Sequence, residues 1–468
     1  MQKISNQASD DGEHGTQYRS TAERRAEGKA LRDTVPRQSH GHWKRPKSRP
    51  NPIDLLNASN EGRLPQLIPI RYGRMLQSPF AFYRGSAAVM ACDLSHTPVT
   101  GHRVQACGDA HLMNFGGFAT PERLQVFDIN DLDETLPAPW EWDLKRLAAS
   151  VIIAGRHIDL PESQAVRAAH GCVQSYREHM ANYSTMRVID VWYDKIDVEK
   201  LVAHAPDEKM RRRAERRFEE ARERSVPDDD FPKLAEHRGA TPRIKDDPPL
   251  IFHPTGETQA EYDARIAEAL ASYRTSLPEH VRVLFDRFHC CDVAVKVVGI
   301  GSVGTMCLIG LFMAGDDDPL FLQFKQARAS VLEPYAGKSL HRNHGERVVA
   351  GQRLMQSASD IFLGWTMGSK SGRHFYVRQL RDMKVSAIIE GFDGPTLMAY
   401  AELCAWALAR AHARSGDAAI ISGYVGSSEE FDEAICEFAV DYADQNELDH
   451  AAFVKAARSG KIKVQLDA

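Results

Sequence analysis

Residues 104–118 read VQACGDAHLMNFGGF, a stretch in which an apolar run passes at once into short polar side chains. Asp109 follows a glycine, His111 comes two positions later, and Asn114 stands five positions after Asp109. Polar side chains placed this closely after an apolar run are typical of a loop that carries function on a rigid scaffold. The stretch therefore predicts a functional loop centred on Asp109.

A second acidic segment follows directly, with the sequence LQVFDINDLDE at residues 124–134. Its apolar start predicts a strand that delivers Asp128, and we expect Asp109, Asn114 and Asp128 to lie close together. Such an oxygen-rich set suits Mg²⁺, and Asp109 would then be free to orient a hydroxyl group. The D-x-x-x-x-N spacing followed by a strand-borne Asp is used by phosphoryl-transfer sites.

The alternative is that these acids form turns and helix caps, which are common after strands. It remains fully open for Asp131, Asp133 and Asp143, the last of which stands in the predicted helix PWEWDLKRLAASVIIAG. His111 is interpreted as a structural, hydrogen-bonded loop residue. Arg84, in the segment FYRG, could either reach a phosphate or brace the loop.

The bulk composition indicates a large protein without special compartment signals. The chain has 468 residues, of which 43% are apolar, and its formal net charge of −5 argues against a general nucleic-acid binder. The first residues contain no apolar signal segment, and no stretch reaches the length needed to span a bilayer. The eight scattered cysteines suggest reduced thiols. We expect a cytoplasmic protein with no nucleic-acid or membrane partner, and the oligomeric state stays undetermined.

Composition shifts along the chain suggest five segments. The predicted organisation is a polar N-terminal arm at 1–60, a catalytic-loop segment at 61–190, a charged insertion at 191–260, a helix and nucleotide-binding β lobe at 261–395, and C-terminal helices at 396–468 that pack back on the catalytic-loop lobe.

Periodicity and capping signals predict helices over 161–185, 261–277 and 396–414, the last with Pro395 in its first turn. Residues 207–224 hold eight Lys and Arg among acidic residues. We interpret them as a solvated helix with salt bridges rather than as a binding site for phosphate or nucleic acid.

A glycine-rich loop appears late in the chain, within VAVKVVGIGSVGTMCLIGLFMAGDDDPLFLQFKQAR at residues 293–328. Gly299, Gly301 and Gly304 form G-x-G-x-x-G, with Ser302 inside the motif. A dinucleotide-binding loop would run straight into a helix. Here an apolar run, an acidic turn and a second apolar run follow, which predicts strand, loop, strand, turn and strand. A glycine-rich hairpin without a ligand is the open alternative.

Lys325 lies at the end of the predicted strand LFLQFK, and Glu333 follows eight residues later. A strand Lys that contacts phosphates and is held by a helix Glu is what a kinase-type site needs. The alternatives are a solvated Lys at a strand edge and, because Pro334 follows, a Glu333 outside any long helix. Further on, HFYVRQLRDMK at 374–384 predicts another strand.

The segments GDAHLMN, VFDIND and WDLKRLA resemble the catalytic region of the aminoglycoside phosphotransferase and choline kinase branch of protein-kinase-like enzymes. The resemblance implies that Asp109 is the catalytic-loop Asp, that Asn114 and Asp128 are metal ligands, and that Asp143 braces the loop from the following helix. Cys107 departs from the His that this branch carries before Gly-Asp.

The parts then occur in rotated order, because the glycine loop and Lys325 follow the catalytic loop instead of preceding it. The resemblance therefore implies an α+β, two-lobed, protein-kinase-like fold with circularly permuted order. It would combine a helical lobe with a small antiparallel-sheet lobe.

A wider set of motifs, including SPFAFYRG, GDAHLMNFG, VFDINDLDE, VGIGSVGT and YVRQLRDMK, resembles the bacterial family known as domain of unknown function 2252. The resemblance spans about residues 22–460, and Gln326 stands where this pattern leads us to expect Glu.

Together these patterns predict an ATP- and Mg²⁺-dependent phosphotransferase acting on an unidentified, small-molecule hydroxyl acceptor. Asp109 is the predicted catalytic residue, and Asn114 and Asp128 are the predicted metal ligands. The predicted nucleotide-binding residues are Gly299, Gly301, Ser302, Gly304, Lys325 and Glu333. Two alternatives remain: a nucleotide-binding regulatory protein without turnover, and a transferase that moves AMP to a protein.

Overall fold

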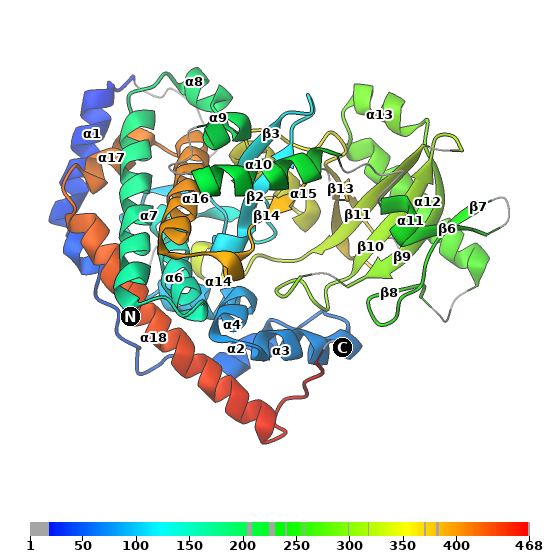
Figure 1. Cartoon of the computed structure of the whole chain (residues 1–468), viewed down its shortest axis with the longest axis horizontal. Helices are drawn as coiled ribbons and strands as arrows, with labels where there is room; N and C mark the ends of the chain where they lie inside the picture. Colours follow the sequence, from blue (N-terminus) through cyan, green and yellow to red (C-terminus); the bar gives the residue numbers. More distant parts are fainter. Residues whose placement is uncertain are drawn as a thin grey trace.

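The chain folds into a helix-rich part and a sheet-rich part that lie side by side (Figure 1). Every strand pair in the computed structural model is antiparallel, so the fold is of the mixed α+β class. The helical lobe is defined here as residues 18–223 and 383–466, and the sheet lobe as 230–380. The structure describes residues 18–203, 208–223, 230–238, 241–254, 256, 258–297, 299–316, 318–368, 371–380 and 383–466.

The long helices α6, α7 and α16 form the centre of the helical lobe. Residues Trp140 to Gly155 of α6 are all buried, its charged residues included, because this helix is packed on all sides. The helices of this lobe are α1 (Thr21–Ala30), α2 (Pro52–Ala58), α3 (Ile68–Leu76), α4 (Pro79–Gly85), α5 (Ala87–Leu94), α6 (Trp140–His157), α7 (Glu162–Tyr183), α8 (Val188–Tyr193), α9 (Val198–Ala203), α10 (Glu208–Glu223), α16 (Gly394–Ser415), α17 (Ala418–Val425) and α18 (Glu430–Arg458).

The predicted helices over 161–185 and 396–414 are confirmed as α7 and α16, which pack along each other. Helix α16 begins as expected, since Asp393 caps it by accepting a hydrogen bond from Thr396 N and Pro395 lies in its first turn. Thus the two ends of the chain build one lobe, and the sheet lobe lies between them in sequence.

The predicted N-terminal arm is more ordered than its polar composition suggested. Helix α1 opens with a capping box between Ser20 and Glu23 and packs on α17. The contact is close enough that a Cβ on Gly28 would lie 2.0 Å from Ile420 O. Residues 18–60 are therefore part of the helical lobe, and the first 17 residues lie outside the described part.

The sheet lobe holds one six-stranded sheet in the order β12-β13-β11-β10-β9-β8. Its strands are β8 (Ile251–Phe252), β9 (His289–Lys296), β10 (Cys307–Met313), β11 (Pro319–Ala327), β12 (Gly364–Met367) and β13 (His374–Gln379), and its helices are α11 (Phe231–Leu234), α12 (Gln259–Ser276), α13 (Glu279–Phe285), α14 (Glu333–Ala336) and α15 (His344–Met355). The predicted strand–loop–strand–turn–strand order is confirmed as β9, β10 and β11, and the predicted helix over 261–277 as α12.

Shorter strands complete the fold. A four-stranded sheet runs in the order β14-β2-β3-β5, and two further pairs are β1 with β4 and β6 with β7. Their bounds are β1 (Arg103–Ala106), β2 (Phe115–Ala119), β3 (Gln125–Ile129), β4 (Leu136–Pro139), β5 (Ile196–Asp197), β6 (Ala235–Arg238), β7 (Thr241–Ile244) and β14 (Val385–Ser386). Strands β1, β2 and β3 border the two acidic segments.

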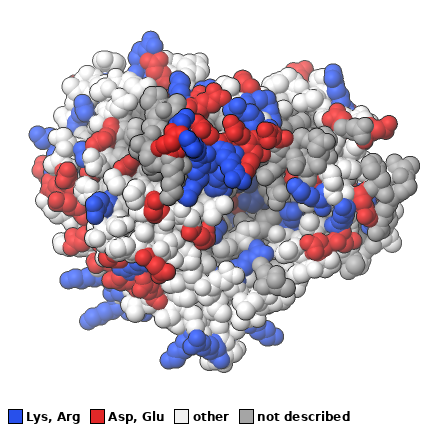
Figure 2. Space-filling model, in the orientation of Figure 1, with Lys and Arg blue, Asp and Glu red and all other residues white. Residues whose placement is uncertain are grey.

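Helix α10 confirms the interpretation of a salt-bridged helix. Arg211 pairs with Glu215 and Arg216 with Glu220, each one helical turn apart. Figure 2 shows a basic patch over this helix, above a hollow between the two lobes. Two of its arginines also tie it down, since Arg213 donates to Gly391 O and Arg217 to Ser386 O. Within the described part of the chain, none of the helices is long and apolar enough to cross a bilayer.

Candidate active site

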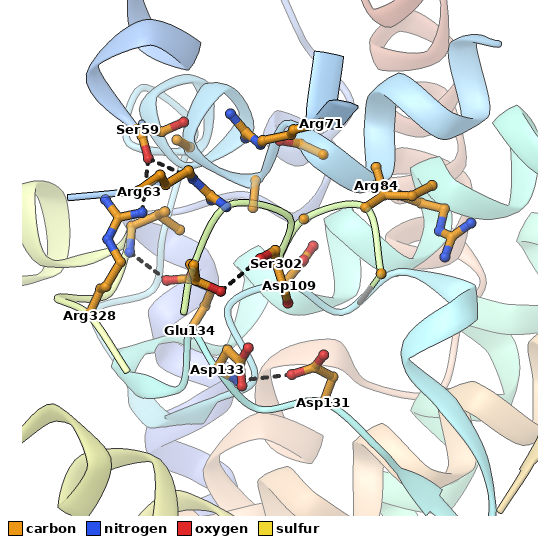
Figure 3. Close-up of a pocket in the computed structure, with 18 of the residues that line it drawn as sticks. Ser59, Arg63, Arg71, Arg84, Asp109, Asp131, Asp133, Glu134, Ser302 and Arg328 are labelled. Carbon is orange, nitrogen blue, oxygen red and sulfur yellow. Dashed lines mark hydrogen bonds between the residues drawn. The ribbon is translucent and has the colours of Figure 1, made fainter. Parts of the chain in front are cut away.

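One polar cavity joins the two predicted loops. Asp109 and Asn114 of the one loop and Gly299, Gly301 and Ser302 of the other all line it, and Figure 3 shows Asp109 and Ser302 among the lining side chains. These two sets lie 190 positions apart (299 minus 109). The tertiary fold therefore brings the glycine loop to the Asp109 loop, as the sequence predicted.

The Asp109 loop is held from beneath by Asp143 of α6. The backbone N–H groups of Cys107 and Gly108 donate to the two carboxylate oxygens of Asp143, at 2.5 and 2.9 Å. Gly108 has φ of 82°, a left-handed conformation that favours glycine. The predicted bracing by Asp143 is confirmed, and it does not need the His that Cys107 replaces.

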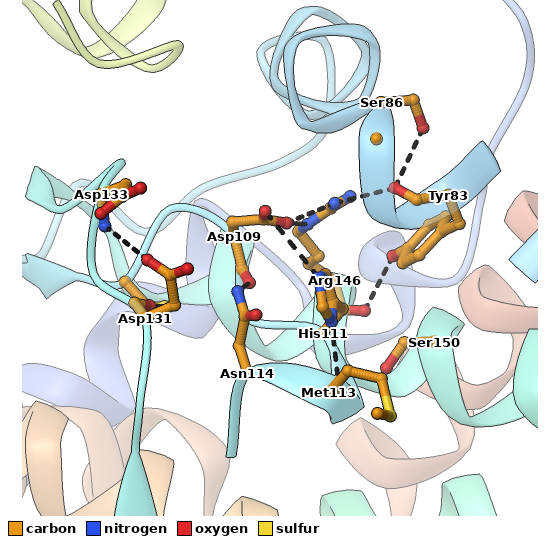
Figure 4. Close-up of polar contacts among 12 residues, drawn as sticks. Tyr83, Ser86, Asp109, His111, Met113, Asn114, Asp131, Asp133, Arg146 and Ser150 are labelled. Carbon is orange, nitrogen blue, oxygen red and sulfur yellow. Dashed lines mark hydrogen bonds and ion pairs between the residues drawn. The ribbon is translucent and has the colours of Figure 1, made fainter. Parts of the chain in front are cut away.

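Asp109 is oriented by an arginine that the sequence did not single out. Arg146 Nε donates to Asp109 Oδ1 at 2.6 Å, and Arg146 Nη2 donates to Tyr83 O (Figure 4). Burial raises the pKa of Asp109 above its ordinary value, and Arg146 opposes this shift. The result is a partly buried carboxylate, 19% exposed, with one oxygen fixed and a pKa above that of a surface Asp.

The remaining residues of this loop keep its shape. His111 Nδ1 accepts a hydrogen bond from Met113 N, and burial holds the pKa of His111 well below its ordinary value, so the ring is neutral. This agrees with the structural role expected for it. Asn114 Nδ2 donates to Asp109 O at 2.6 Å, which leaves its amide oxygen as the group able to take a cation.

The structure does not bring Asp128 to the cavity. Its side chain is fully buried, and its oxygens accept hydrogen bonds from Arg410 Nη2 at 2.6 and 2.7 Å and from Ser357 N at 2.7 Å. A carboxylate enclosed in this way has no face for a metal ion. The prediction of Asp128 as a metal ligand therefore disagrees with the structure, because the strand directs this side chain toward Arg410 of α16 and Ser357 instead of the cavity.

Asp131 takes the place that Asp128 was expected to fill. It lines the cavity with Asp109 and Asn114, and its side chain is 31% exposed. Lys325 Nζ lies 3.4 Å from Asp131 Oδ2 and 2.9 Å from Asp133 Oδ2. Burial opposes the charge of Lys325, yet these two carboxylates outweigh burial and raise the pKa of Lys325 well above its ordinary value.

Lys325 is thus paired with acids, but not with Glu333. Glu333 opens the short helix α14, and its Oε1 accepts a hydrogen bond from Ser330 N at 3.3 Å. Helix α15, which follows in the chain, packs on β11 and β13 and brings Gln352 and Gln356 toward the Lys325 side. The predicted Lys–Glu pair is replaced by a Lys–Asp–Asp cluster, in which Asp133 also accepts from Tyr376 OH at 2.6 Å.

The glycine loop is anchored to the N-terminal half of the chain. Arg74 Nη1 donates to Gly299 O at 2.5 Å, Arg63 Nη1 to Val303 O at 2.6 Å, and Leu64 N to Gly304 O at 2.7 Å. Gly299 and Gly304 have φ of 69° and 87°, which favours glycine at both positions. Gly304 therefore shapes and anchors the loop, while Gly299, Gly301 and Ser302 face the cavity.

A second, larger cavity lies on the Lys325 side of the same loop. It has a volume of about 410 Å³, against about 180 Å³ for the first, and the two share Asp131, Gly299 and Ser302 in their walls. Its basic wall consists of Lys296, Lys325, Arg378 and Lys384. Burial, with Arg378 adding to it, lowers the pKa of Lys384 to about 8. This chamber is suited to a polyanion.

The donor set of the smaller cavity fits Mg²⁺ in part. No group of three His, Cys, Asp or Glu side chains suited to a metal ion occurs among the residues that the structure describes. A site completed by phosphate oxygens and water needs fewer protein ligands. The amide oxygen of Asn114 and the carboxylate of Asp131 line the same cavity and provide such a partial set, whereas Asp128 does not.

Sequence reasoning missed several residues of this site. Arg146 stands three positions after Asp143 on the same helix, a spacing that could have placed it under the same loop. Arg63, Arg71 and Arg328 also line the smaller cavity. No local pattern marked them, because they come from separate parts of the chain.

The fold and the site together define a mixed α+β protein with a polar, two-chambered cleft around a glycine loop. A family model described as "Uncharacterized protein conserved in bacteria (DUF2252)" matches residues 63–456, and the chain belongs to this family. Neither a curated protein nor a solved structure matches the chain.

Proposed function

We propose that this protein is an ATP-dependent phosphotransferase that moves a phosphoryl group from a nucleotide to a hydroxyl group of a small molecule. The observation that carries the proposal is the cavity shared by Asp109, Asn114 and the Gly299–Ser302 loop. Phosphoryl transfer depends almost entirely on positioning and on charge stabilisation. A glycine loop, a buried lysine and a set of carboxylates are the parts that such a site requires.

The order of elements supports a protein-kinase-like fold with circularly permuted order. Strand β9, the glycine loop, β10, β11 with Lys325, helix α15 and strands β12 and β13 follow one another as the resembled enzymes would have them. The Asp109 loop precedes this lobe instead of following it, while α16, which packs along α7 in the helical lobe, comes after it.

In this proposal the larger cavity takes the nucleotide. Its phosphates would lie beside Lys325 and under the glycine loop, because charge-assisted hydrogen bonds to phosphate are strong in a site that excludes water. Arg378 and Lys384 add positive charge to the same wall. Burial, and after it Arg378, lower the pKa of Lys384, and a bound polyanion would oppose both effects by stabilising the charged ammonium group.

Asn114 and Asp131 would hold Mg²⁺ between the two chambers. The ion would supply charge neutralisation for the phosphate oxygens. Lys325 contributes to the same end and keeps Asp131 ionised, since it lowers the pKa of that carboxyl against the effect of burial.

Asp109 would act on the acceptor. Its free Oδ2 takes the proton of the acceptor hydroxyl as the new oxygen–phosphorus bond forms and the bond to the leaving nucleotide diphosphate breaks. Its raised pKa suits this role better than that of a surface Asp. Arg146 is a positioning residue, because it touches Asp109 and not the reacting atoms.

The test is to incubate the purified protein with Mg²⁺ and ATP labelled at the α or the γ position. We expect hydrolysis or transfer of the γ label, with a loss of at least about a hundredfold in Asp109→Asn because general-base removal has an effect of this order. Asp190→Asn, on the exposed helix α8, is the matched control and should match the unaltered protein.

Retention of the α label would instead support nucleotidyl transfer to protein. Equal γ turnover by Asp109→Asn would contradict the role of Asp109. Absence of any thermal shift with ATP in the unaltered protein would remove the nucleotide proposal as a whole.

A further inference from the structure

Four arginines surround the smaller cavity, the one that contains Asp109. Arg63, Arg71 and Arg84 lie above Ser302 and Asp109 in Figure 3, and Arg328 lies to one side. They come from two distant parts of the chain: residues 63–84, which include α3 and α4, and the position directly after β11. Their convergence is a product of the tertiary fold.

None of the four forms an ion pair with another described residue; their partners are backbone carbonyls and one amide. Arg63 donates to Val303 O, Arg328 to Ser59 O, and Arg71 to Gly85 O and Asn60 Oδ1. Arg84 Nε is buried and has no hydrogen-bond partner in the described part of the protein. The buried Arg49, by contrast, is paired with Asp93 and Asp449.

Burial opposes the charge of each of the four arginines and lowers the pKa of each. Burial lowers the pKa of Arg71 to about 10, and Arg328 adds to this effect. Burial lowers the pKa of Arg63 as well, with Arg71 and Arg328 contributing, while Glu134 acts in the opposite sense. Glu134 itself has a pKa raised by burial. Glu134 thus acts on Arg63, Arg71 and Arg328, and Asp109 acts on Arg84, but among the described residues neither acid forms an ion pair with any of the four.

We infer that the smaller cavity binds an anionic group of the acceptor, a phosphate or a carboxylate, through Arg63, Arg71, Arg84 and Arg328. The acceptor would then be a small hydroxyl compound that carries its own negative charge, held with its hydroxyl toward Asp109. Guanidinium groups bind such oxyanions through paired, charge-assisted hydrogen bonds. The volume of about 180 Å³ fits a compact metabolite rather than a protein segment. The role of the anion as part of an acceptor rests on the proposed function.

The same oxyanion chemistry could come from the nucleotide itself, so the test separates the two sources. Orthophosphate serves as the probe, and its binding to the full-length protein is measured by calorimetry with Mg²⁺ and a saturating β,γ-imido analogue of ATP. The analogue fills the positions of all three nucleotide phosphates. We expect orthophosphate to bind in its presence.

Arg84→Gln and Arg328→Gln test the cluster, because these two arginines make few contacts that hold the fold together. Each should weaken orthophosphate binding about tenfold while leaving the affinity for the ATP analogue within about twofold. Arg84→Lys, which keeps the charge, should recover part of the loss. Arg187→Gln, at the residue directly before α8, is the matched control, because this arginine is 79% exposed, and the variant should bind like the unaltered protein.

Exclusion of orthophosphate by the ATP analogue would assign the cluster to the nucleotide and overturn the inference, as would unchanged orthophosphate binding in both Gln variants. Failure of the proposed function looks different. The analogue would then bind to none of the proteins, while the Gln variants would still lose orthophosphate and uphold the anion site.

Discussion

Two aspartates three positions apart, Asp128 and Asp131, have opposite surroundings. Asp128 points from strand β3 toward α16 and is fully buried. Its two oxygens accept hydrogen bonds from Arg410 and Ser357. Asp131 stands in the loop after that strand, keeps 31% of its side chain exposed, and faces the cavity with Lys325 beside it. The same residue type therefore serves as a structural clamp in one place and as a candidate ligand in the other. The difference lies in whether protein groups already occupy the hydrogen-bonding positions of the carboxylate oxygens.

The largest expected effect separates these two aspartates by stability. Asp128→Asn should lower the free energy of unfolding by about 3–5 kcal/mol, because it leaves a buried Arg410 without its counter-charge. Arg410 is sensitive to this loss, since its Nε and Nη1 have no partner in the described part of the chain. Asp131→Asn should cost about 1 kcal/mol at most, as Lys325 keeps Asp133. Equal losses in urea denaturation would erase the distinction.

The next largest effect concerns ligand binding, which we expect to depend on Asp131. Asp131→Asn should weaken Mg²⁺-dependent ADP binding about tenfold or more, because the amide is a poorer metal ligand and no longer carries charge. Without Mg²⁺ its ADP affinity should change by less than about threefold. Calorimetry with and without the metal measures both. A loss of the same size in the absence of Mg²⁺ would argue against Asp131 as a metal ligand.

A smaller effect concerns how the pKa of Asp109 is set. Burial raises this pKa and Arg146 lowers it, so the acid limb of the rate profile should lie above the ordinary Asp value of about 4. Activity is lost as pH falls through this raised pKa, because the protonated carboxyl cannot accept the acceptor's proton. Arg146→Gln should move the limb to higher pH by about one unit. Rates from pH 4 to 9 test this, and a limb that moves to lower pH would contradict it.

The smallest effect comes from an ion pair in solvent. Arg216→Ala, which breaks the exposed pair with Glu220 on α10, should change the unfolding free energy by less than about 0.5 kcal/mol. The three variants then compare a buried ion pair (Asp128–Arg410), an ion pair at the cavity (Asp131–Lys325) and an ion pair in solvent (Arg216–Glu220). A change above about 1 kcal/mol in thermal or urea unfolding would mean that α10 contributes more to the fold than its exposed pairs indicate.

Much of the fold could be predicted because its signals are local. The glycines, the acidic turn and the apolar runs of 293–328 predicted three successive strands, and the cap and apolar content of 393–415 predicted a long buried helix. The Asp143 brace was predictable for a similar reason, since it lies on the helix that follows the loop. The helical structure within the polar N-terminal arm had no such local signal, because α1 is stabilised by its contact with α17 and not by its own composition.

The site was only partly predictable, and the failures share a cause. Glu333 was chosen as the partner of Lys325 by its distance along the chain, yet Asp131 and Asp133 reach that lysine from 190 or more positions away (325 minus 133 and 325 minus 131). From the sequence, Asp128 is a better candidate metal ligand than Asp131, because a residue on a strand is held more rigidly than one in a loop. The choice depended on which face of β3 the helical lobe covers, and that face is set by packing.

By itself, the sequence determined the α+β class, the order of the strands around the glycine loop, and the two segments that line one cavity. Those features follow from backbone preferences and apolar periodicity, which act over a few neighbouring residues. Only the tertiary structure decided which aspartate is clamped, which acids hold Lys325, and that four arginines converge without a carboxylate partner. Charges act through space, so their partners depend on where packing places them.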